Sequence, residues 1–254
     1  FFPFGWQGVM GGAALIFFAY IGFDAVSTAA EEARNPQRDL PIGILGSLLF
    51  CTVIYIAVAM VLTGAVHYSQ LNVSHPVAHA LELIGSPTAA GLVSVGAIAG
   101  LSSVLLVLLY GQSRIFFAMS RDGLLPAAFS RVHPRTRTPV TTIIATGVVV
   151  ALVAGLLPIG AVAELVNVGT LAAFMLVSIG VIVLRRTQPE LKRPFRTPFV
   201  PWTPILAILF CGYLIASLDA VTLLRFVVWM AIGMVLYFCY SVRHSTLGRA
   251  AAND

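Results

Sequence analysis

The sequence predicts an all-α integral membrane protein, and two observations carry this prediction. Hydrophobic residues make up 59% of the 254 residues and charged residues only 10%, against about 25% charged in an ordinary soluble domain. The apolar residues also form runs long enough for helices that cross a bilayer, which need about 20 residues each. A water-soluble enzyme is therefore excluded. Because the chain begins at Phe1 without the basic region or cleavage site of a signal peptide, we expect it to start midway through a longer protein.

Polar segments separate about seven apolar runs. The predicted helices cover Gly8–Ala30, Leu40–Val66, Leu92–Met119, Val140–Leu157, Ala161–Leu184, Trp202–Leu218 and Val221–Tyr240. Most Arg residues and the only lysine, Lys192, lie in the connections after the first, third and fifth helices and in the tail. Cytoplasmic loops carry most of the Lys and Arg of a membrane protein. The start of the chain is therefore predicted to lie outside the cell and its C-terminus in the cytoplasm.

Residues 72–85 are predicted to form a short external helix that lies on the membrane surface. Its apolar positions share one helical face: Val77, Ala80, Leu81 and Ile84. His75 and His79 are four residues apart on this helix, with His67 nearby, and this spacing could hold zinc. We interpret these side chains instead as solvated histidines, and we predict no metal site.

The first predicted helix carries two signs of an interruption near Ile21. Gly22 weakens a helix, and Asp24 places an ionisable group inside an apolar run. Such a group costs about 2.5 to 3.5 kcal/mol on insertion scales and is a functional candidate by default. If the helix unwinds here, its outer half ends with unpaired carbonyls of Phe18, Ala19 and Ile21, a negative pole that suits an ammonium group. Asp24 would then begin the inner half.

The sequence alone leaves two possible roles open for each of four side chains. Asp24 could bind a proton, or it could only cap the inner half-helix. Phe18 could cover a substrate or offer its ring face to a cation, although packing is the commoner role of such an aromatic. Glu164 and Asn167, near the start of the fifth helix, could face an outer vestibule, but capping or solvent exposure explains them equally well.

Several stretches resemble one transporter family. Residues 17–24 and 31–41 closely resemble the sixth helix and following cytoplasmic loop of bacterial cationic amino acid transporters, which belong to the amino acid, polyamine and organocation (APC) superfamily. Residues 114–139 and 193–201 agree as well. The resemblance covers nearly the whole chain and implies a permease.

The resemblance also implies an architecture. It is the LeuT-like broken-helix transporter fold, represented incompletely by the second inverted repeat and two final helices. The five-helix repeat would occupy residues 1–185, with its first span broken near 21–23. A cytoplasmic loop at 186–201, a two-helix hairpin at 202–241 and a cytoplasmic tail at 242–254 would follow. The first repeat would be missing.

For the substrate site, the resemblance implies that the backbone at Phe18, Ala19, Ile21 and Gly22 receives the substrate's amino group. Phe18 would help to cover the substrate. Asp24 lies where related exchangers carry an acidic residue tied to their pH response. The implied role of Asp24 is therefore proton coupling.

Two further groups of candidates follow from the resemblance. Ser102 and Ser103 would be a vestige of the ion site of sodium-coupled relatives, with a hydrogen bond to the preceding turn or a contact between helices as the alternatives. Proton-coupled members place a lysine from the fifth helix there, and this chain has none in a span. The candidates for ion pairs at a cytoplasmic gate are Glu31, Glu32, Arg34 and Arg121, and exposed pairs of this kind are individually weak.

The predicted function is secondary active transport of cationic or neutral amino acids across the cell (inner) membrane, coupled to protons. The sequence has no phosphate-binding loop for ATP-driven pumping, and no cofactor is expected. The expected partners are the substrate, protons, the lipid bilayer and the missing N-terminal helices; nucleic acid is not expected. The alternative is a nontransporting membrane module, either half of a split carrier or a truncated product that binds a partner.

Overall fold

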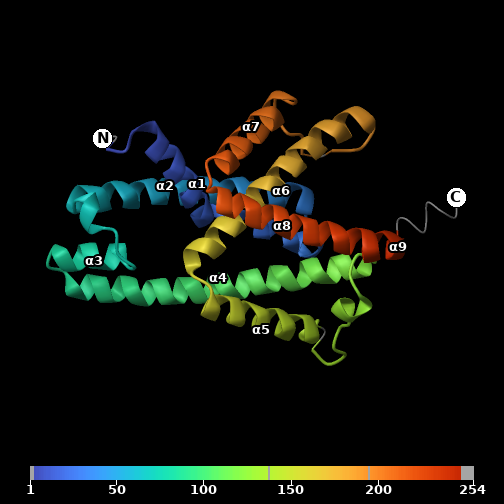
Figure 1. Cartoon of the computed structure of the whole chain (residues 1–254), viewed down its shortest axis with the longest axis horizontal. Coiled ribbons are helices and arrows are strands. Elements are labelled where there is room, and N and C mark those ends of the chain that lie inside the picture. Colours follow the sequence, from blue (N-terminus) through green and yellow to red (C-terminus); the bar gives the residue numbers. More distant parts are fainter. Residues whose placement is uncertain (1–2, 137, 194, 247–254) are drawn as a thin grey trace. The chain divides into compact units, whose positions relative to one another are not determined.

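The computed structural model describes residues 3–136, 138–193 and 195–246, and every regular element in these ranges is a helix (Figure 1). The α-helices are α1 (Gly5–Tyr20), α2 (Pro36–Ala65), α3 (Pro76–Leu83), α4 (Pro87–Arg121), α5 (Val140–Leu156), α6 (Ile159–Thr187), α7 (Trp202–Ala216), α8 (Ala220–Leu236) and α9 (Val242–His244). The 3-10 segments are η1 (Phe23–Glu32), η2 (Tyr68–Gln70) and η3 (Ala127–Ser130), and a π-helical turn, η4 (Tyr237–Ser241), joins α8 to α9. The prediction of an all-helical chain is confirmed.

Proline opens three of the helices. Pro36, Pro76 and Pro87 are the first residues of α2, α3 and α4. Proline suits this position because its φ angle is already helical and its missing N–H would have no partner in the first turn. The starts of these helices therefore follow from local sequence.

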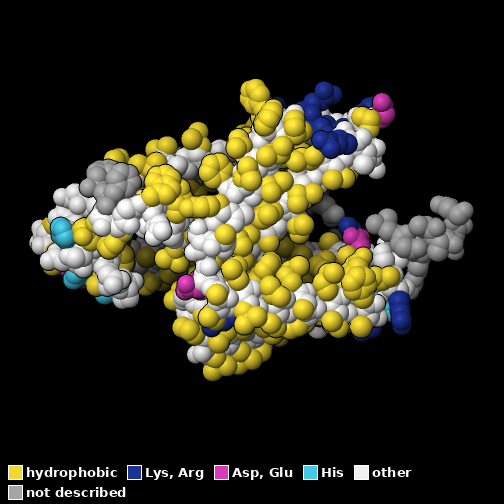
Figure 2. Space-filling view, turned by 45° about the horizontal axis from the view of Figure 1, so that its top comes forward, with side chains coloured by type: hydrophobic (Ala, Val, Ile, Leu, Met, Phe, Trp, Pro, Cys, Tyr) yellow, Lys and Arg dark blue, Asp and Glu magenta, His cyan; other side chains and the backbone are white. Residues whose placement is uncertain are grey.

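Within the described parts of the chain, five helical stretches are long and apolar enough to cross a membrane. They are Gly5–Thr28, Pro36–Ala65, Pro87–Arg121, Ile159–Thr187 and Ala220–His244. The other two predicted spans correspond to α5 and α7, which are apolar but only 17 and 15 residues long. Figure 2 shows hydrophobic side chains over most of the visible helical surface, while charged side chains gather in small groups. Such a surface suits a lipid environment, and the chain is a multi-pass membrane protein.

The chain divides into two compact units. One comprises the described residues up to Ile21 and from Ser113 onward, and the other is Gly22–Gln112. This division cuts α4 and separates α1 from η1. It differs from the predicted division at residues 185 and 201, which is based on repeats rather than on contacts and stays a prediction.

In the first unit, α6 is the central helix and packs against α1, α7 and α8. Val168 and Leu171 lie on one face of α6 and are completely buried. Phe174, about one turn further along, meets Phe17 of α1 edge-on, with ring centroids 6.0 Å apart and planes at 87°. Aromatic pairs of this geometry contribute about 0.5–1.5 kcal/mol beyond burial. The position of α1 within this unit is therefore set by α6.

The turn after α4 holds the end of the last membrane helix. Ser241 Oγ donates to the Leu124 carbonyl over 2.8 Å, and the Thr246 N–H donates to the Asp122 carbonyl over 3.1 Å. Between these contacts, Gly123 has a φ angle of 79°, and a Cβ atom added to it would overlap the His244 carbonyl. The turn thus requires glycine for its backbone conformation and for the close approach of α9.

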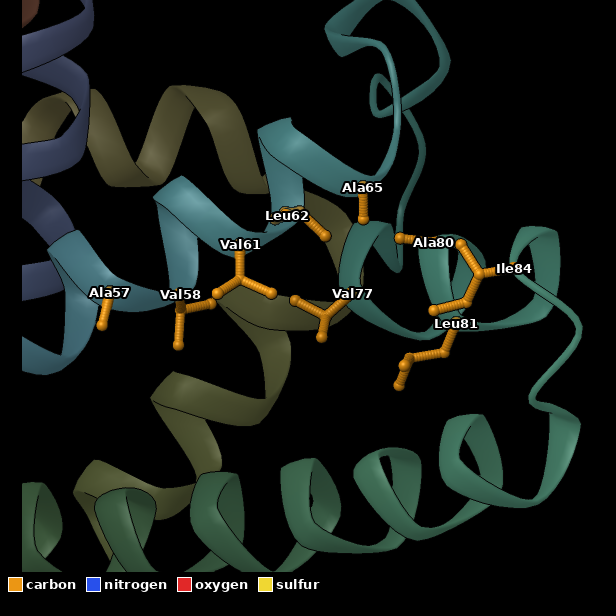
Figure 3. A pocket seen from close by; sticks show the side chains of 9 residues that line it. All are labelled: Ala57, Val58, Val61, Leu62, Ala65, Val77, Ala80, Leu81 and Ile84. Atoms are coloured by element: carbon orange, nitrogen blue, oxygen red, sulfur yellow. The ribbon is translucent and has the colours of Figure 1, made fainter.

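In the second unit, α2 packs against η1 and α3. The α3 residues predicted to share one apolar face line a groove of about 330 Å³ together with residues of α2 (Figure 3). The α2 side of the groove consists of Ala57, Val58, Val61, Leu62 and Ala65. The apolar periodicity of α3 therefore corresponds to the face that it turns toward α2.

Candidate functional site

The first apolar span is interrupted at Ile21 and Gly22. Helix α1 ends at Tyr20, and Ile21 has an extended backbone with φ −60° and ψ 129°. Gly22 follows with φ 129° and ψ −21°, a conformation that residues with a side chain rarely adopt. The chain then continues as η1 rather than as the α-helical inner half that we expected. The 3-10 form is tighter, with about 3.0 residues per turn.

The end of α1 was expected to leave the carbonyls of Phe18, Ala19 and Ile21 unpaired as a negative pole. The last carbonyls of an α-helix lack partners in the regular pattern and carry a partial negative charge. The Phe18 carbonyl, however, accepts a hydrogen bond from the Ile21 N–H over 3.3 Å. The prediction that this carbonyl is unpaired is therefore wrong. A carbonyl oxygen has two lone pairs, so the Phe18 carbonyl can accept a second hydrogen bond.

The two neighbouring phenylalanines of α1 differ in their surroundings. Phe17 is half-buried and contacts Phe174. Phe18 has 41% of its surface exposed. Phe17 therefore anchors the helix, whereas Phe18 is exposed close to the interruption.

Asp24 lies in the first turn of η1 and is half-buried. Its Oδ1 atom accepts a hydrogen bond from the Gly22 N–H over 3.2 Å, and the Gly22 carbonyl accepts one from the Ala25 N–H over 3.1 Å. Asp24 thus holds the backbone of Gly22 in its unusual conformation. This is a capping contact, and it brings two of the predicted site residues together.

Asn167 is a residue of this region whose role the sequence left open. It lies on α6, is completely buried, and donates a hydrogen bond from Nδ2 to the Ala14 carbonyl of α1 over 3.0 Å. Solvent exposure, one of the two simple explanations offered for it, is therefore wrong. Among the described residues, its Oδ1 atom has no hydrogen-bond partner. Asn167 stood out in the sequence as an amide inside an apolar run. No neighbouring residue in the sequence indicated that Ala14 is its hydrogen-bond partner.

Glu164, one turn earlier on α6, is half-buried and accepts a hydrogen bond from Thr222 Oγ1 of α8. Thr222 itself is 1% exposed. The carboxylate therefore links α6 to α8, a role that neither helix capping nor full exposure describes.

The two serines proposed as a vestigial ion site lie on exposed positions of α4. Ser102 Oγ donates to the Ile98 carbonyl over 2.8 Å, which is the hydrogen bond to the preceding turn given as an alternative. The described contacts thus join Gly22 to Asp24, while the Ser102 hydroxyl is bound within its own helix.

The gate candidates are only partly described. The side chains of Glu31 and Glu32 lie outside the described residues. Arg34 is exposed, and Arg121 Nε lies 3.7 Å from Asp122 Oδ1 with both side chains about half exposed. An exposed pair of sequence neighbours contributes little to stability. The gate therefore remains a prediction.

Comparison with known proteins gives the family of this chain. The sequence pattern of a family described as amino acid permease matches residues 1–245. The chain is 53% identical over 249 residues to the methylthioribose transporter of Bacillus subtilis (strain 168) and 51% identical over 250 residues to the branched-chain amino acid permease BcaP of the same organism. It is 47% identical over 190 residues to the vacuolar cationic amino acid transporter 4 of Arabidopsis thaliana.

These matches differ in coverage. The two bacterial alignments include 98% of this chain and 54% of each relative, and the plant alignment includes 75% of this chain and 32% of the relative. The chain therefore spans about half the length of the bacterial relatives. The predicted resemblance is confirmed, and the relatives are transporters rather than enzymes. The chain belongs to the amino acid permease family, within the APC superfamily.

Proposed function

We propose that this chain supplies, in a secondary active amino acid transporter, the part of the substrate site that binds the amino group. One observation carries the proposal: α1 stops at Tyr20 inside an apolar span that extends from Gly5 to Thr28. Peptide carbonyls at the end of a helix carry about half a negative charge. Few other groups at this depth in a membrane would solvate an ammonium ion.

The site would consist of the backbone at Phe18, Ala19, Ile21 and Gly22. The carbonyls would accept hydrogen bonds from the substrate's ammonium group, and the exposed Phe18 ring would cover the substrate. Cationic and neutral amino acids share this ammonium group. The carbonyl pole would therefore recognise amino acids as a class, while selectivity among them would come from other residues.

The names of the relatives indicate two classes of candidate substrate. One relative is a branched-chain amino acid permease and another is a methylthioribose transporter, and their identities to this chain are 51% and 53%. These two sequence identities are too similar to decide between the two substrate classes. The carbonyl pole favours an amino acid because methylthioribose has no ammonium group to bind there.

Asp24 is the proposed proton-coupling residue. It is half-buried beside Gly22, so a change in its protonation would alter the hydrogen bond that holds the interruption. The chain has no lysine in a helix that could take this role, since Lys192 is its only lysine and lies between α6 and α7. Ser102 and Ser103 are the proposed vestige of an ion site.

The proposed architecture is LeuT-like, with α5 and α7 as spans in addition to the five long stretches. At 1.5 Å per residue, 17 residues reach about 26 Å and 15 residues about 23 Å, so both need flanking residues to cross a hydrocarbon core of about 30 Å. The distribution of basic residues supports an external start and a cytoplasmic C-terminus in the cell (inner) membrane. We propose that five further helices complete the carrier.

Uptake into proteoliposomes tests this function. The carrier with five further helices is reconstituted beside the chain alone, and uptake of radiolabelled isoleucine and arginine is measured under an inward proton gradient. We expect uptake by the carrier and none by the chain alone. Excess unlabelled methylthioribose should not compete. A folded carrier that accumulates neither amino acid, or one whose uptake methylthioribose abolishes, contradicts the proposal.

The second candidate is a nontransporting membrane module that binds a partner. It is favoured only by the fraction of the relatives that this chain spans, 54%. Co-purification of the chain with separately expressed N-terminal helices, without uptake by the assembled pair, would support it.

A further inference from the structure

We propose that His75, the residue directly before α3, and His79 and Glu82 of α3 form a binding site for a divalent ion such as zinc. One candidate ligand atom from each of these residues lies within 4.8 Å of the others. Two imidazoles and one carboxylate are a ligand set that suits zinc. The structure thereby adds Glu82 to the histidine pair that the sequence suggested, and this proposal is independent of the transport function.

His79 and Glu82 share one face of α3, and His75, directly before the helix, continues this face. At about 100° per residue, positions 75, 79 and 82 fall within roughly 60° of one another. The groove-lining residues Val77, Leu81 and Ile84 fall on the opposite side. Binding of an ion would therefore leave the contact between α3 and α2 in place.

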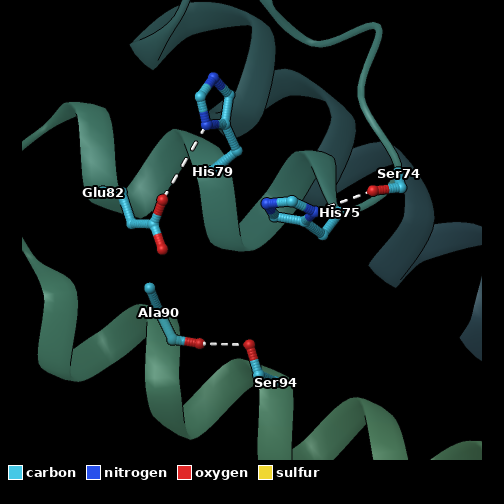
Figure 4. Close-up of polar contacts among 6 residues, drawn as sticks. All are labelled: Ser74, His75, His79, Glu82, Ala90 and Ser94. Atoms are coloured by element: carbon cyan, nitrogen blue, oxygen red, sulfur yellow. Dashed lines mark hydrogen bonds and ion pairs between the residues drawn. The ribbon is translucent and has the colours of Figure 1, made fainter.

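The side chains already converge in the structure. His79 Nδ1 lies 4.0 Å from Glu82 Oε2, and the rings of His75 and His79 have centroids 6.2 Å apart and planes at 85° (Figure 4). Zinc–nitrogen bonds of about 2.0–2.1 Å place tetrahedral ligands about 3.4 Å apart. The described separations need to close by little more than 1 Å, which rotation of exposed side chains can provide. His79 and Glu82 are 30% and 55% exposed, so an ion can reach them from solvent.

Ser74 orients the first ligand. Its Oγ atom lies 3.0 Å from His75 Nδ1. A histidine that binds a metal through one nitrogen commonly donates the N–H of the other to an oxygen, which fixes the ring. Ser74 is therefore a positioning residue, and Nε2 is the ligand atom of His75. Three protein ligands leave the fourth tetrahedral position to water.

Metal titration of the purified chain in lipid nanodiscs tests the site. The protein carries no polyhistidine tag, and binding of Zn²⁺ is measured by calorimetry, with Co²⁺ absorption as a readout of tetrahedral coordination. We expect one saturable site that excess Mg²⁺ does not displace, since Mg²⁺ prefers octahedral oxygen ligands. His79→Ala should weaken binding by about 100-fold or more, and Ser74→Ala by about tenfold.

His67→Ala is the matched control. His67 lies in the same connection but contacts Ser69 and Tyr68, so its removal should leave the affinity unchanged. Circular dichroism of each variant must match that of the unsubstituted chain. Absence of a saturable site, equal affinity in His79→Ala and His67→Ala, or octahedral Co²⁺ spectra would each overturn the proposal and leave these residues as solvated histidines.

Discussion

Asn167 ties α6 to α1 by donating a hydrogen bond from Nδ2 to the carbonyl oxygen of Ala14 over 3.0 Å. Asn167 is completely buried, and Ala14 lies fewer than two turns before the end of α1 at Tyr20. A buried polar group is costly unless it is hydrogen-bonded. The bond therefore constrains α1 close to its end, where we propose that peptide carbonyls bind the substrate's ammonium group.

Asn167→Asp should be the most disruptive change at this position. It removes the donor and places a carboxylate oxygen against the Ala14 carbonyl, in a buried setting where charges are expensive. We expect about 2 kcal/mol or more of destabilisation, measured by unfolding in detergent, and loss of uptake in the complete carrier. Asn167→Leu should destabilise the protein less than Asn167→Asp, because it also removes the unsatisfied Oδ1 atom. It should still reduce uptake.

Thr170→Val is the matched control for Asn167. Thr170 lies one turn away on α6, and its hydroxyl donates within the helix to the Val166 carbonyl. Its removal should change stability by less than about 1 kcal/mol. If Asn167→Asp behaves like this control, the bond to Ala14 does not position α1.

Gly22→Ala tests the interruption itself. A Cβ at Gly22 would meet no atom within 4 Å, so the cost comes only from φ 129°, about 1–3 kcal/mol. Relief of this strain should shift the backbone at Ile21 and raise the KM for amino acid uptake. Gly12→Ala, on α1 and also without neighbours within 4 Å, should leave the KM unchanged. Equal effects of the two substitutions would contradict a special role for Gly22.

Gly123→Ala tests the turn that holds α9. The substitution combines an unfavourable φ of 79° with overlap of the His244 carbonyl, which is backbone and cannot rotate away. We expect more than about 2 kcal/mol of destabilisation and faster proteolysis of the C-terminal segment. Gly155→Ala, in α5 with open space around it, serves as the control. Resistance to protease equal to that of the control would count against the contact.

Thr222→Val tests the link between α6 and α8. The change preserves shape but removes the donor to Glu164, and hydrogen bonds to charged groups are worth about 1.5–3 kcal/mol. Glu164→Gln retains an acceptor and should cost less than Thr222→Val. Thermal unfolding of both single variants and of the double variant gives the coupling energy. A coupling near zero would show that the two side chains act independently.

Features with local signals were predictable from the sequence. The interruption of α1 could be located because Gly22 and Asp24 stand inside an apolar run, and the apolar face of α3 followed from the spacing of Val77, Ala80, Leu81 and Ile84. The 3-10 form of η1 was not predictable, since the same apolar pattern fits an α-helix. Hydropathy locates the helices but does not give their exact ends, which differ by one or two residues between assignment criteria.

Features that depend on distant partners could not be predicted. Ala14 and Asn167 are 153 residues apart, and Thr222 and Glu164 are 58 apart, so no local pattern relates them. Glu82 was within reach of sequence reasoning because residues four and seven positions after His75 share its helical face. The sequence instead offered His67 as the nearby third ligand, whereas the structure groups Glu82 with the pair.

Asp24 can be separated into its two roles by a pair of substitutions. Asp24→Asn keeps an oxygen that accepts from the Gly22 N–H but cannot bind a proton at neutral pH, whereas Asp24→Ala removes both properties. We expect Asp24→Asn to retain amino acid binding in the complete carrier while uptake loses its dependence on external pH. Asp24→Ala should lose binding as well, because Gly22 is no longer held. An unchanged pH profile in Asp24→Asn would remove the proton role and leave Asp24 as a cap, and equal loss of binding in both variants would show that the charge, rather than the hydrogen bond, maintains the interruption.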